Sequence, residues 1–122
     1  MFKIKEIGFF IYPVTDVSRA RKFYEGVLGL SPSSDYPVTE ESKWIEYNIG
    51  TQTLAIGSSP DWQPSEAGTS AALEVEDFDE AIKHLKDNGV AFKLEPMDFP
   101  TCKMAVAYDP DKNIMIIHQR KG

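Results

Sequence analysis

The sequence predicts an α+β fold in which two βαβββ modules form a curved mixed sheet around a cleft, with the helices on the convex face. Three observations lead to this prediction. The chain has the length of one globular domain, a strand followed by an amphipathic helix occurs twice, and extended segments separated by turn residues follow each helix. Because the order of elements is the same in both halves, we interpret the chain as one domain with an internal repeat.

Length and composition limit the possible functions. The 122 residues are 42% hydrophobic and 26% charged, which is typical of a globular protein with a core of modest size. The net charge is −6, so the chain lacks the excess of basic residues expected of a nucleic-acid-binding protein or of a module held on anionic lipid. The chain has one cysteine and two histidines, which excludes an internal disulfide and a Cys/His zinc cluster of standard spacing. We therefore expect a cytoplasmic protein with no nucleic-acid or membrane partner.

Two predicted helices carry matching end signals. Thr15 or Asp16 is suited to cap the first helix, and Asp77 caps the second, where Glu80 completes a capping box. Each helix is expected to end at a glycine, because glycine adopts the left-handed conformation that closes a helix. These glycines are Gly29 and Gly89.

Extended segments surround the two helices and define the modules. Their β-forming side chains and the turn residues between them predict strands. The segments are residues 3–14, 42–49 and 51–57 in the first half and residues 70–76, 90–95, 102–108 and 113–119 in the second half. Module 1 is expected over about residues 1–58, a linker over about 59–68 and module 2 over about 69–120, all within a single domain of residues 1–122.

The last predicted strand is apolar on both sides. Alternation along a strand directs Ile114, Ile116 and His118 to one face and Met115 with Ile117 to the other. We expect the second pair to pack on a helix. The first set then faces the concave side of the sheet, where a cleft suited to a small molecule would lie.

Motifs along nearly the whole chain, from about residue 4 to residue 118, resemble one known family. The motifs are Val14 with Asp16, Phe23-Tyr24 with Leu28-Gly29, Asn88-Gly89, and Asp109-Pro110-Asp111 with Asn113. In order and spacing they are similar to the glyoxalase, bleomycin-resistance and extradiol-dioxygenase superfamily, the vicinal oxygen chelate fold of paired βαβββ modules. The resemblance also implies a homodimer, since members of this family commonly pair.

The resemblance implies where a metal ion would be held. The metal enzymes of the superfamily use His, Gln or Glu at four strand positions, which correspond here to Phe9, Ala55, Ser70 and Ile116. None of these side chains is a competent metal ligand, and a metal site needs three or four converging donors. We therefore predict no metal and no cofactor, as in the antibiotic-binding members of the superfamily.

One residue of the Asp109-Pro110-Asp111 turn departs from the family pattern. Lys112 stands where glycine is usual. A residue with a side chain is tolerated there if Asn113 or a type I turn takes the strain.

The predicted cleft combines aromatic and aliphatic side chains with a few polar groups, a mixture suited to an aromatic or cationic organic molecule. The predicted lining residues are Phe9, Ile11, Trp44, Glu46, Asn48, Ala55, Ser70, Ala72, Glu74, Ile114, Ile116 and His118. Trp62, in the predicted linker, is a lid, a dimer contact or an anchor for its own loop.

The polar residues leave alternatives open. Glu46 lies either in the cleft, where burial would tune it as a base, or in water on the other face of its strand. Glu74 is either a pocket residue or exposed at a strand end. His118 is either a ligand or acid-base group or an ordinary strand side chain. These three are the candidate catalytic residues.

We expect a metal-independent small-molecule binding protein. The alternative is a small-molecule lyase, isomerase or dioxygenase-like enzyme of the same superfamily. A third possibility is an interaction module whose cleft is filled by its own side chains. The sequence does not identify the ligand.

Overall fold

The computed structural model describes residues 2–37 and 43–122, so Ser42 at the start of one predicted strand lies outside the described residues. The chain divides into two compact units, unit 1 from Met1 to Gln63 and unit 2 from Pro64 to Gly122. None of the helices in the described ranges is both long and apolar enough to cross a membrane.

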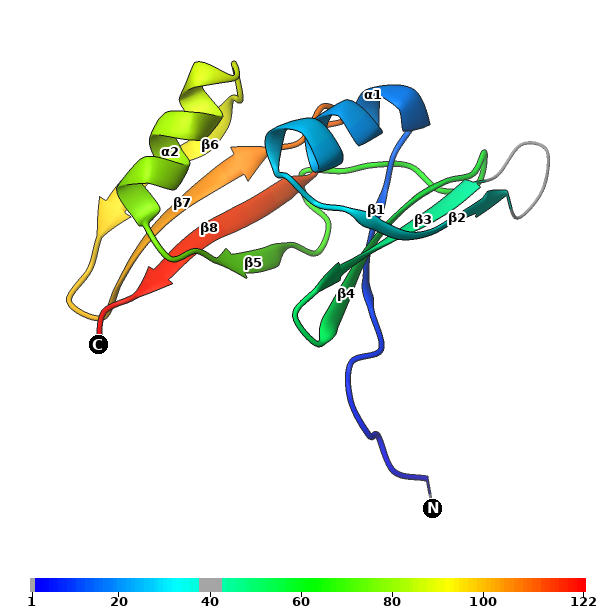
Figure 1. The fold of residues 1–122 in the computed structure, drawn as a ribbon, viewed down its shortest axis with the longest axis horizontal. Helices are drawn as coiled ribbons and strands as arrows, with labels where there is room; N and C mark the ends of the chain where they lie inside the picture. Colours follow the sequence, from blue (N-terminus) through cyan, green and yellow to red (C-terminus); the bar gives the residue numbers. More distant parts are fainter. Residues whose placement is uncertain (1, 38–42) are drawn as a thin grey trace. The chain divides into compact units, whose positions relative to one another are not determined.

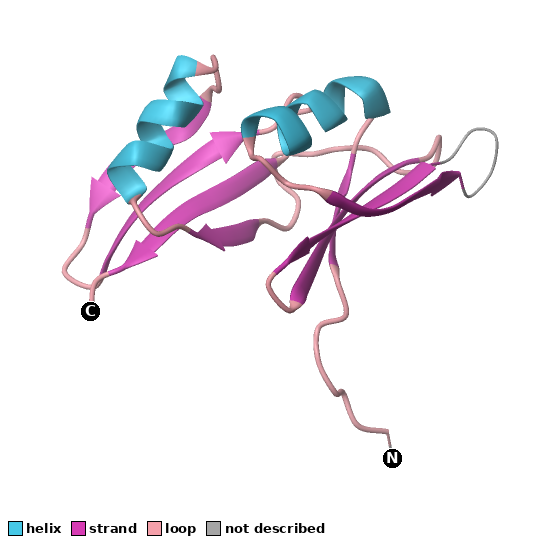
Figure 2. Ribbon diagram, in the orientation of Figure 1, coloured by secondary structure: helices cyan, strands magenta, loops and turns pink. Residues whose placement is uncertain are grey.

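Unit 1 is a βαβββ arrangement with an open, curved four-stranded sheet (Figure 1). The sheet order is β1-β4-β3-β2, and β1 runs parallel to β4 while the other pairs are antiparallel. The helical segment lies on one face of the sheet (Figure 2). The elements are β1 Phe10–Pro13, α1 Val17–Arg21, η1 Lys22–Val27, β2 Pro32–Pro37, β3 Lys43–Ile49 and β4 Gln52–Ser58.

Unit 2 repeats the same topology. Its sheet order is β5-β8-β7-β6, again with one parallel pair, β5 with β8. The predicted α+β fold of two βαβββ modules is therefore confirmed. The elements are β5 Ala71–Glu74, α2 Phe78–Asp87, β6 Phe92–Asp98, β7 Cys102–Tyr108 and β8 Ile114–Arg120.

The core of unit 1 is built on three tyrosines. Tyr12, Tyr24 and Tyr47 are fully buried, and the ring of Tyr24 lies 6.3 Å from each of the other two. Tyr24 comes from η1, which is a π-helix, whereas the apolar spacing predicted a regular helix over this segment. At the end of η1 the Leu28 N–H donates to the carbonyl of Phe23, five residues earlier, which is the hydrogen-bond spacing of a π-helix.

The core of unit 2 lies between α2 and one face of its sheet. Phe78, Ile82 and Leu85 are buried on α2, and Met115 and Ile117 are buried on β8. Alternation along β8 therefore directs Met115 and Ile117 to the helix, as the sequence predicts. Ile114, Ile116 and His118 remain half-buried on the opposite face.

The helix ends follow the predicted signals. Asp16, rather than Thr15, caps α1, and its carboxylate accepts from the backbone N–H of Arg19 at 3.0 Å. Asp77 caps α2 and accepts from Glu80 N–H at 3.1 Å. Gly29 and Gly89 have φ angles of 74° and 75°, the left-handed conformation expected at a helix end.

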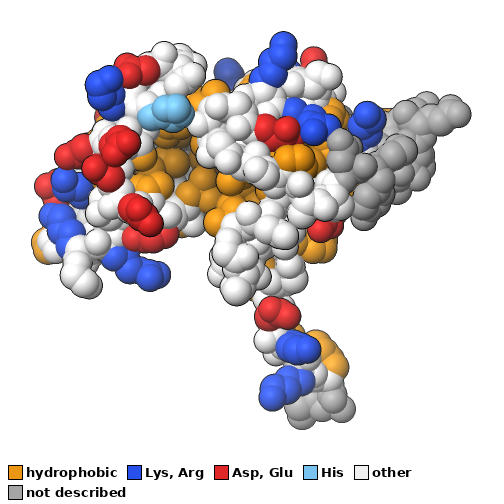
Figure 3. Space-filling view, in the orientation of Figure 1, with side chains coloured by type: hydrophobic (Ala, Val, Ile, Leu, Met, Phe, Trp, Pro, Cys, Tyr) orange, Lys and Arg blue, Asp and Glu red, His pale blue; other side chains and the backbone are white. Residues whose placement is uncertain are grey.

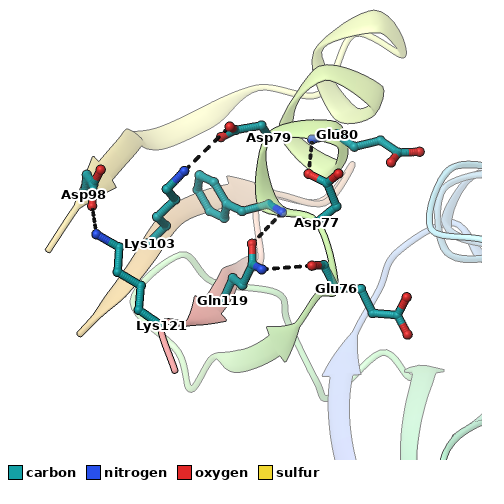
Figure 4. A network of polar contacts seen from close by, with 9 residues as sticks. Glu76, Asp77, Asp79, Glu80, Asp98, Lys103, Gln119 and Lys121 are labelled. Carbon is teal, nitrogen blue, oxygen red and sulfur yellow. Dashed lines mark hydrogen bonds and ion pairs between the residues drawn. The ribbon is translucent and has the colours of Figure 1, made fainter. Parts of the chain in front are cut away.

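A side chain from the last strand ties α2 to the sheet of unit 2 (Figure 4). The Gln119 carbonyl oxygen accepts from Phe78 N–H at 2.8 Å, and its amide donates to the carbonyl of Glu76 at 2.8 Å. Gln119 thereby satisfies one of the N–H groups that a helix start leaves unpaired.

The sequence did not predict strand β2. Its sequence begins and ends with proline, which interrupts the usual strand pattern. The strand is tolerated because it lies at the edge of its sheet, where one row of N–H groups needs no partner.

The predicted first strand over residues 3–14 is too long. Only Phe10–Pro13 pairs with β4, and β4 begins at Gln52, which the register places opposite Gly8, so residues 2–7 have no strand beside them in this pairing. Residues 2–9 extend from the sheet (Figure 1) and bear both charged and hydrophobic side chains at the surface (Figure 3). The exposed apolar side chains of this segment include Phe2, Ile4 and Ile7.

The turn between β7 and β8 is organised by two buried polar residues. The Asp109 carboxylate accepts from the backbone N–H groups of Asp111 and Asn113 at 2.8 and 2.9 Å and from the Asn113 amide at 2.8 Å. Lys112 itself has a φ of 65°. The prediction that Asn113 or a type I turn takes the strain is therefore wrong, because Lys112 adopts the left-handed conformation directly.

Candidate functional site

The face of the unit 1 sheet opposite the helix carries several of the predicted cleft residues. Ile45 and Tyr47 of β3 are buried beneath the helical segment. Trp44, Glu46 and Asn48 alternate with them and so lie on the free face. Of the two alternatives for Glu46, the structure therefore has the one in which Glu46 lies on the face opposite the helix.

Strand register aligns three of these residues in a row across the sheet. Glu46 pairs with Ala55, and Ala55 pairs with Ile11. Ala55 is completely buried, whereas Ile11 and Glu46 are half-buried. The row therefore presents hydrocarbon with a carboxylate at one end.

An aromatic side chain contacts the Glu46 carboxylate and a second ring packs on the first. The indole N–H of Trp44 donates to Glu46 Oε2 at 2.7 Å. The ring of Phe9 meets the ring of Trp44 edge to face, with centroids 5.2 Å apart and planes at 88°. Phe9 is 46% exposed, and Trp44 is half-buried, so both rings are accessible at the surface of unit 1.

Trp62 extends this aromatic surface. Its backbone pairs with Ser59, and its ring lies 3.3 Å from the position that a Cβ on Gly57 would occupy. Gly57 pairs with Trp44, so both tryptophans lie on the same face of the sheet. The sequence left three alternative roles open for Trp62 and did not indicate a role for Gly57. The signal for this contact is a glycine within an apolar strand segment.

The free face of the unit 2 sheet is mainly hydrocarbon. Register places Ala72, Ile116, Val106 and Leu94 in a row that crosses all four strands. Leu94 is 47% exposed, and Ile116 is half-buried. This row is an apolar surface within unit 2 that α2 does not cover, because α2 packs on the opposite face.

Glu74 and His118 form a polar pair beside that apolar row. His118 Nδ1 lies 2.6 Å from Glu74 Oε1, and Arg120 N–H donates to Glu74 Oε2 at 2.7 Å. The hydrogen bonds from His118 and from the Arg120 backbone lower the pKa of Glu74 from its ordinary value of 4.5. Glu74 is exposed, and His118 is half-buried. The pair is thus a carboxylate with a strong donor at a solvent-accessible position.

The remaining predicted cleft residues lie at the margins of the two free faces. Asn48 is exposed at the end of β3 and accepts from the Thr53 hydroxyl at 3.4 Å. Ser70 lies directly before β5, and Ile114 begins β8 opposite Tyr108.

The residues at the four positions that would hold a metal in the superfamily do not fit one. Phe9 offers a hydrocarbon ring and Ala55 a buried methyl group in unit 1. Ser70 offers one hydroxyl and Ile116 hydrocarbon in unit 2. Within residues 2–37 and 43–122 there is no group of three or more His, Cys, Asp and Glu side chains arranged to hold a metal ion. Divalent metals require several converging oxygen, nitrogen or sulfur donors, which these residues do not supply.

Similar proteins share both the sequence pattern and the fold. The uncharacterized protein YetH of Bacillus subtilis (strain 168) is 29% identical over 119 residues, covering 95% of this chain and 99% of YetH. The antibiotic-binding protein TnmS3 from Streptomyces sp. CB03234 is 25% identical, with a TM-score of 0.80 over 99% of this chain and 100% of TnmS3. A glyoxalase/bleomycin resistance protein from the same Streptomyces strain is 26% identical, with a TM-score of 0.74 over 91% of this chain and 97% of that protein.

The family is established by a match along most of the sequence. A family profile matches residues 6–116, a range that takes in both βαβββ units. The repeated topology and the motifs at the helix ends agree with this match. The chain belongs to the Glyoxalase/Bleomycin resistance protein/Dioxygenase superfamily.

Proposed function

We propose that this protein binds a small organic molecule without a metal ion. One observation carries the proposal: the free sheet faces present partly exposed apolar and aromatic side chains at the positions where a metal enzyme of the superfamily needs ligands. In unit 1 this side chain is Phe9, whose ring contacts Trp44, and in unit 2 it is Ile116. Apolar surface with a few polar groups is typical of small-molecule sites.

The comparison with TnmS3 supports the same class of function. TnmS3 is an antibiotic-binding protein, and the present chain matches it over nearly its whole length. By this similarity the ligand is an organic molecule that places rings or alkyl groups against the sheet. The two carboxylates of the free faces, Glu46 and Glu74, favour a cationic ligand, and the aromatic rings favour an aromatic or cationic one.

The first experiment is thermal unfolding of chelator-treated protein with and without excess Zn²⁺, Ni²⁺, Mn²⁺, Co²⁺ or Fe²⁺. Saturating a specific site at a hundredfold over its dissociation constant adds about 2.7 kcal/mol of stability, a shift of several degrees in a domain of this size. We expect no such shift with any of these ions. A set of soluble aromatic compounds is then expected to raise the unfolding temperature. A specific shift with one metal ion would overturn the metal-independent proposal.

A second candidate function rests on the Glu74–His118 pair. A carboxylate 2.6 Å from an imidazole nitrogen is an arrangement that orients histidine for proton transfer. An enzyme of the lyase or isomerase class would use this pair at the edge of the apolar face of unit 2. Once a substrate is found, loss of turnover with retained binding in His118→Asn would favour this candidate over binding alone.

We also propose that the protein is a cytoplasmic homodimer. Exposed apolar side chains in residues 2–9 support pairing, because Phe2, Ile4 and Ile7 are each at least 79% exposed in the single chain. The single cysteine, Cys102, agrees with a reducing compartment. Sedimentation at tens of micromolar, a customary working concentration for testing association, would contradict the dimer if it gave the monomer mass.

A further inference from the structure

The free face of unit 1 holds an aromatic cluster, defined here as Phe9, Trp44 and Trp62, and the Trp44 ring of this cluster contacts the carboxylate of Glu46. The Phe9 and Trp44 rings are in edge-to-face contact, and Trp62 packs on Gly57 beside Trp44. Rings from three separate segments therefore gather where the sheet is not covered by its helix. Trp62 is 36% exposed and Phe9 is 46% exposed, so a ligand can reach the cluster within this unit.

The carboxylate in this cluster is held in place by an uncharged group. The Trp44 indole N–H donates to Glu46 Oε2 at 2.7 Å, which fixes the carboxylate next to the ring. The donor is neutral, so it orients the negative charge without cancelling it. In the described part of the chain, Trp44 is the side chain to which the Glu46 carboxylate is hydrogen-bonded, and no Lys, Arg or His forms an ion pair with it.

This arrangement differs from that of Glu25, a second half-buried carboxylate among the described residues of unit 1. Glu25 lies on η1, where Arg21 Nε forms an ion pair with it at 2.7 Å and the Tyr47 hydroxyl donates to it at 2.9 Å. The charge of Glu25 is therefore balanced by its own module, whereas among the described residues no cation pairs with Glu46. A half-buried carboxylate is only partly hydrated, so a cation supplied by a ligand would stabilise it.

Aromatic rings and a carboxylate together select one chemical class. The faces of Trp and Phe rings attract a positive charge through their quadrupole, and the attraction grows when the cation leaves water. A carboxylate next to the rings adds direct Coulomb attraction. A neutral aromatic ligand would use the rings but gain nothing from Glu46.

We propose that Phe9, Trp44, Trp62 and Glu46 form a site for an organic ammonium group, a protonated or quaternary amine carried by the bound molecule. The amine lies against the rings with its charge next to the free oxygen of Glu46. This inference rests on the proposed small-molecule-binding function and adds to it the chemical group that is recognised and the residues that recognise it.

The test is a titration of intrinsic fluorescence with benzyltrimethylammonium. The chain contains two tryptophans, and both belong to the aromatic cluster, so emission reports on the site without a label. We expect a saturable change with benzyltrimethylammonium and a much weaker one with benzyl alcohol, which has the ring but no charge.

Three variants distinguish the contribution of the Glu46 charge to the affinity from that of the aromatic rings. Glu46→Gln keeps an acceptor for the Trp44 indole and is expected to weaken benzyltrimethylammonium binding by about tenfold, the effect of losing roughly one strong charge contact. Glu80→Gln removes an equal charge from the exposed surface of α2 and is expected to leave the affinity unchanged. Trp62→Leu removes one ring while Trp44 continues to report, and it is also expected to weaken binding.

The outcomes distinguish this inference from the broader proposal. If benzyl alcohol binds as tightly as benzyltrimethylammonium, or if folded Glu46→Gln binds the cation with wild-type affinity, the ammonium site is refuted while small-molecule binding stands. If neither probe changes the fluorescence but neutral aromatic compounds raise the unfolding temperature, the ammonium site is refuted in the same way. If no organic compound binds by either measurement, both proposals fail.

Discussion

Unit 1 and unit 2 each bring a carboxylate to the free face of a four-stranded mixed sheet, and they surround it differently. Glu74 in unit 2 lies 2.6 Å from a histidine nitrogen and accepts a backbone N–H from Arg120. Glu46 in unit 1 accepts one indole N–H, from Trp44, whose ring packs against Phe9. The same topology therefore supports one carboxylate beside a histidine and one beside a neutral aromatic donor.

The two units also differ in how the last hairpin is closed. The β3–β4 turn of unit 1 has Gly50 at a φ of 60° and Thr51 beside it, both exposed. The β7–β8 turn of unit 2 is closed by buried Asp109 and Asn113, which exchange side-chain and backbone hydrogen bonds. The unit 2 turn is thus held by buried hydrogen bonds, whereas the unit 1 turn depends on the left-handed conformation that Gly50 adopts.

The largest expected effect tests that contrast. Asp109→Ala leaves buried N–H groups of the turn without an acceptor, and we expect it to lower the free energy of unfolding by about 3 kcal/mol. Thr51→Ala, in the exposed turn of unit 1, is expected to change it by less than about 0.5 kcal/mol. Urea unfolding followed by circular dichroism measures both. Equal effects would mean that the buried turn contributes no more than the exposed one.

The next prediction concerns the attachment of α2. Gln119→Leu removes the acceptor for Phe78 N–H and the donor to Glu76, and it is expected to destabilise the protein by about 1 to 2 kcal/mol. Gln52→Leu, at the exposed start of β4, serves as the matched substitution and is expected to have little effect. If Gln119→Leu left the free energy of unfolding unchanged, Asp77 alone would be sufficient to start the helix.

The carboxylate of unit 2 predicts a pH dependence. The pKa of Glu74 is lowered in the folded protein by its hydrogen bonds to His118 and to the Arg120 backbone. The unfolded chain therefore binds the proton more readily, so the stabilisation is present above the ordinary value of 4.5 and is lost as the pH falls below it.

Urea midpoints between neutral pH and pH 3 would measure this loss. The difference between wild type and Glu74→Gln is expected to shrink toward acid, because the variant has no charge to titrate. A difference that stays constant across this range would show that the hydrogen bonds of Glu74 do not distinguish the folded from the unfolded state.

The smallest expected effect is an increase in the free energy of unfolding on replacing Lys112. Lys112 has a φ of 65°, which is unfavourable for a residue with a side chain by about 1 to 2 kcal/mol. Lys112→Gly relieves this strain but increases the entropy of the unfolded chain, so we expect a net stabilisation of about 0.5 to 1 kcal/mol. Gly50→Lys in unit 1 should show the opposite sign, and thermal unfolding of the two variants provides the check.

The sequence predicted most of the fold because its signals are local. Helix caps at Asp16 and Asp77 and alternation along β8 depend on residues near one another in the chain, and the structure has them as predicted. Strand β2 was missed because Pro32 and Pro37 oppose strand pairing except at a sheet edge, and sheet order is not a local property. The π-helix η1 was missed for a related reason, since the period of a helix is set by packing as well as by spacing.

The candidate site was only partly accessible to the same reasoning. Alternation predicted that Trp44 and Glu46 share one side of their strand, but it left open which side that is and contains no information about which side chains touch. The contact between Trp62 and Gly57 joins a loop to a strand, and a sequence pattern does not specify such a contact. Whether the predicted lining residues bind a ligand remains a prediction.

The parallel strand pairs also influence how the chain folds. Phe10 pairs with Leu54 and Ala71 with Met115, so in both units the first strand must find a partner at the same large separation along the chain. Closing a loop of roughly 40 residues costs about 1.5 kcal/mol more in chain entropy than closing a short hairpin. The hairpins β3–β4 and β7–β8 are therefore expected to form early and to act as templates, while β1 and β5 join last and exchange their amide hydrogens first. Each unit would then fold by the same route, from its last strands back to its first.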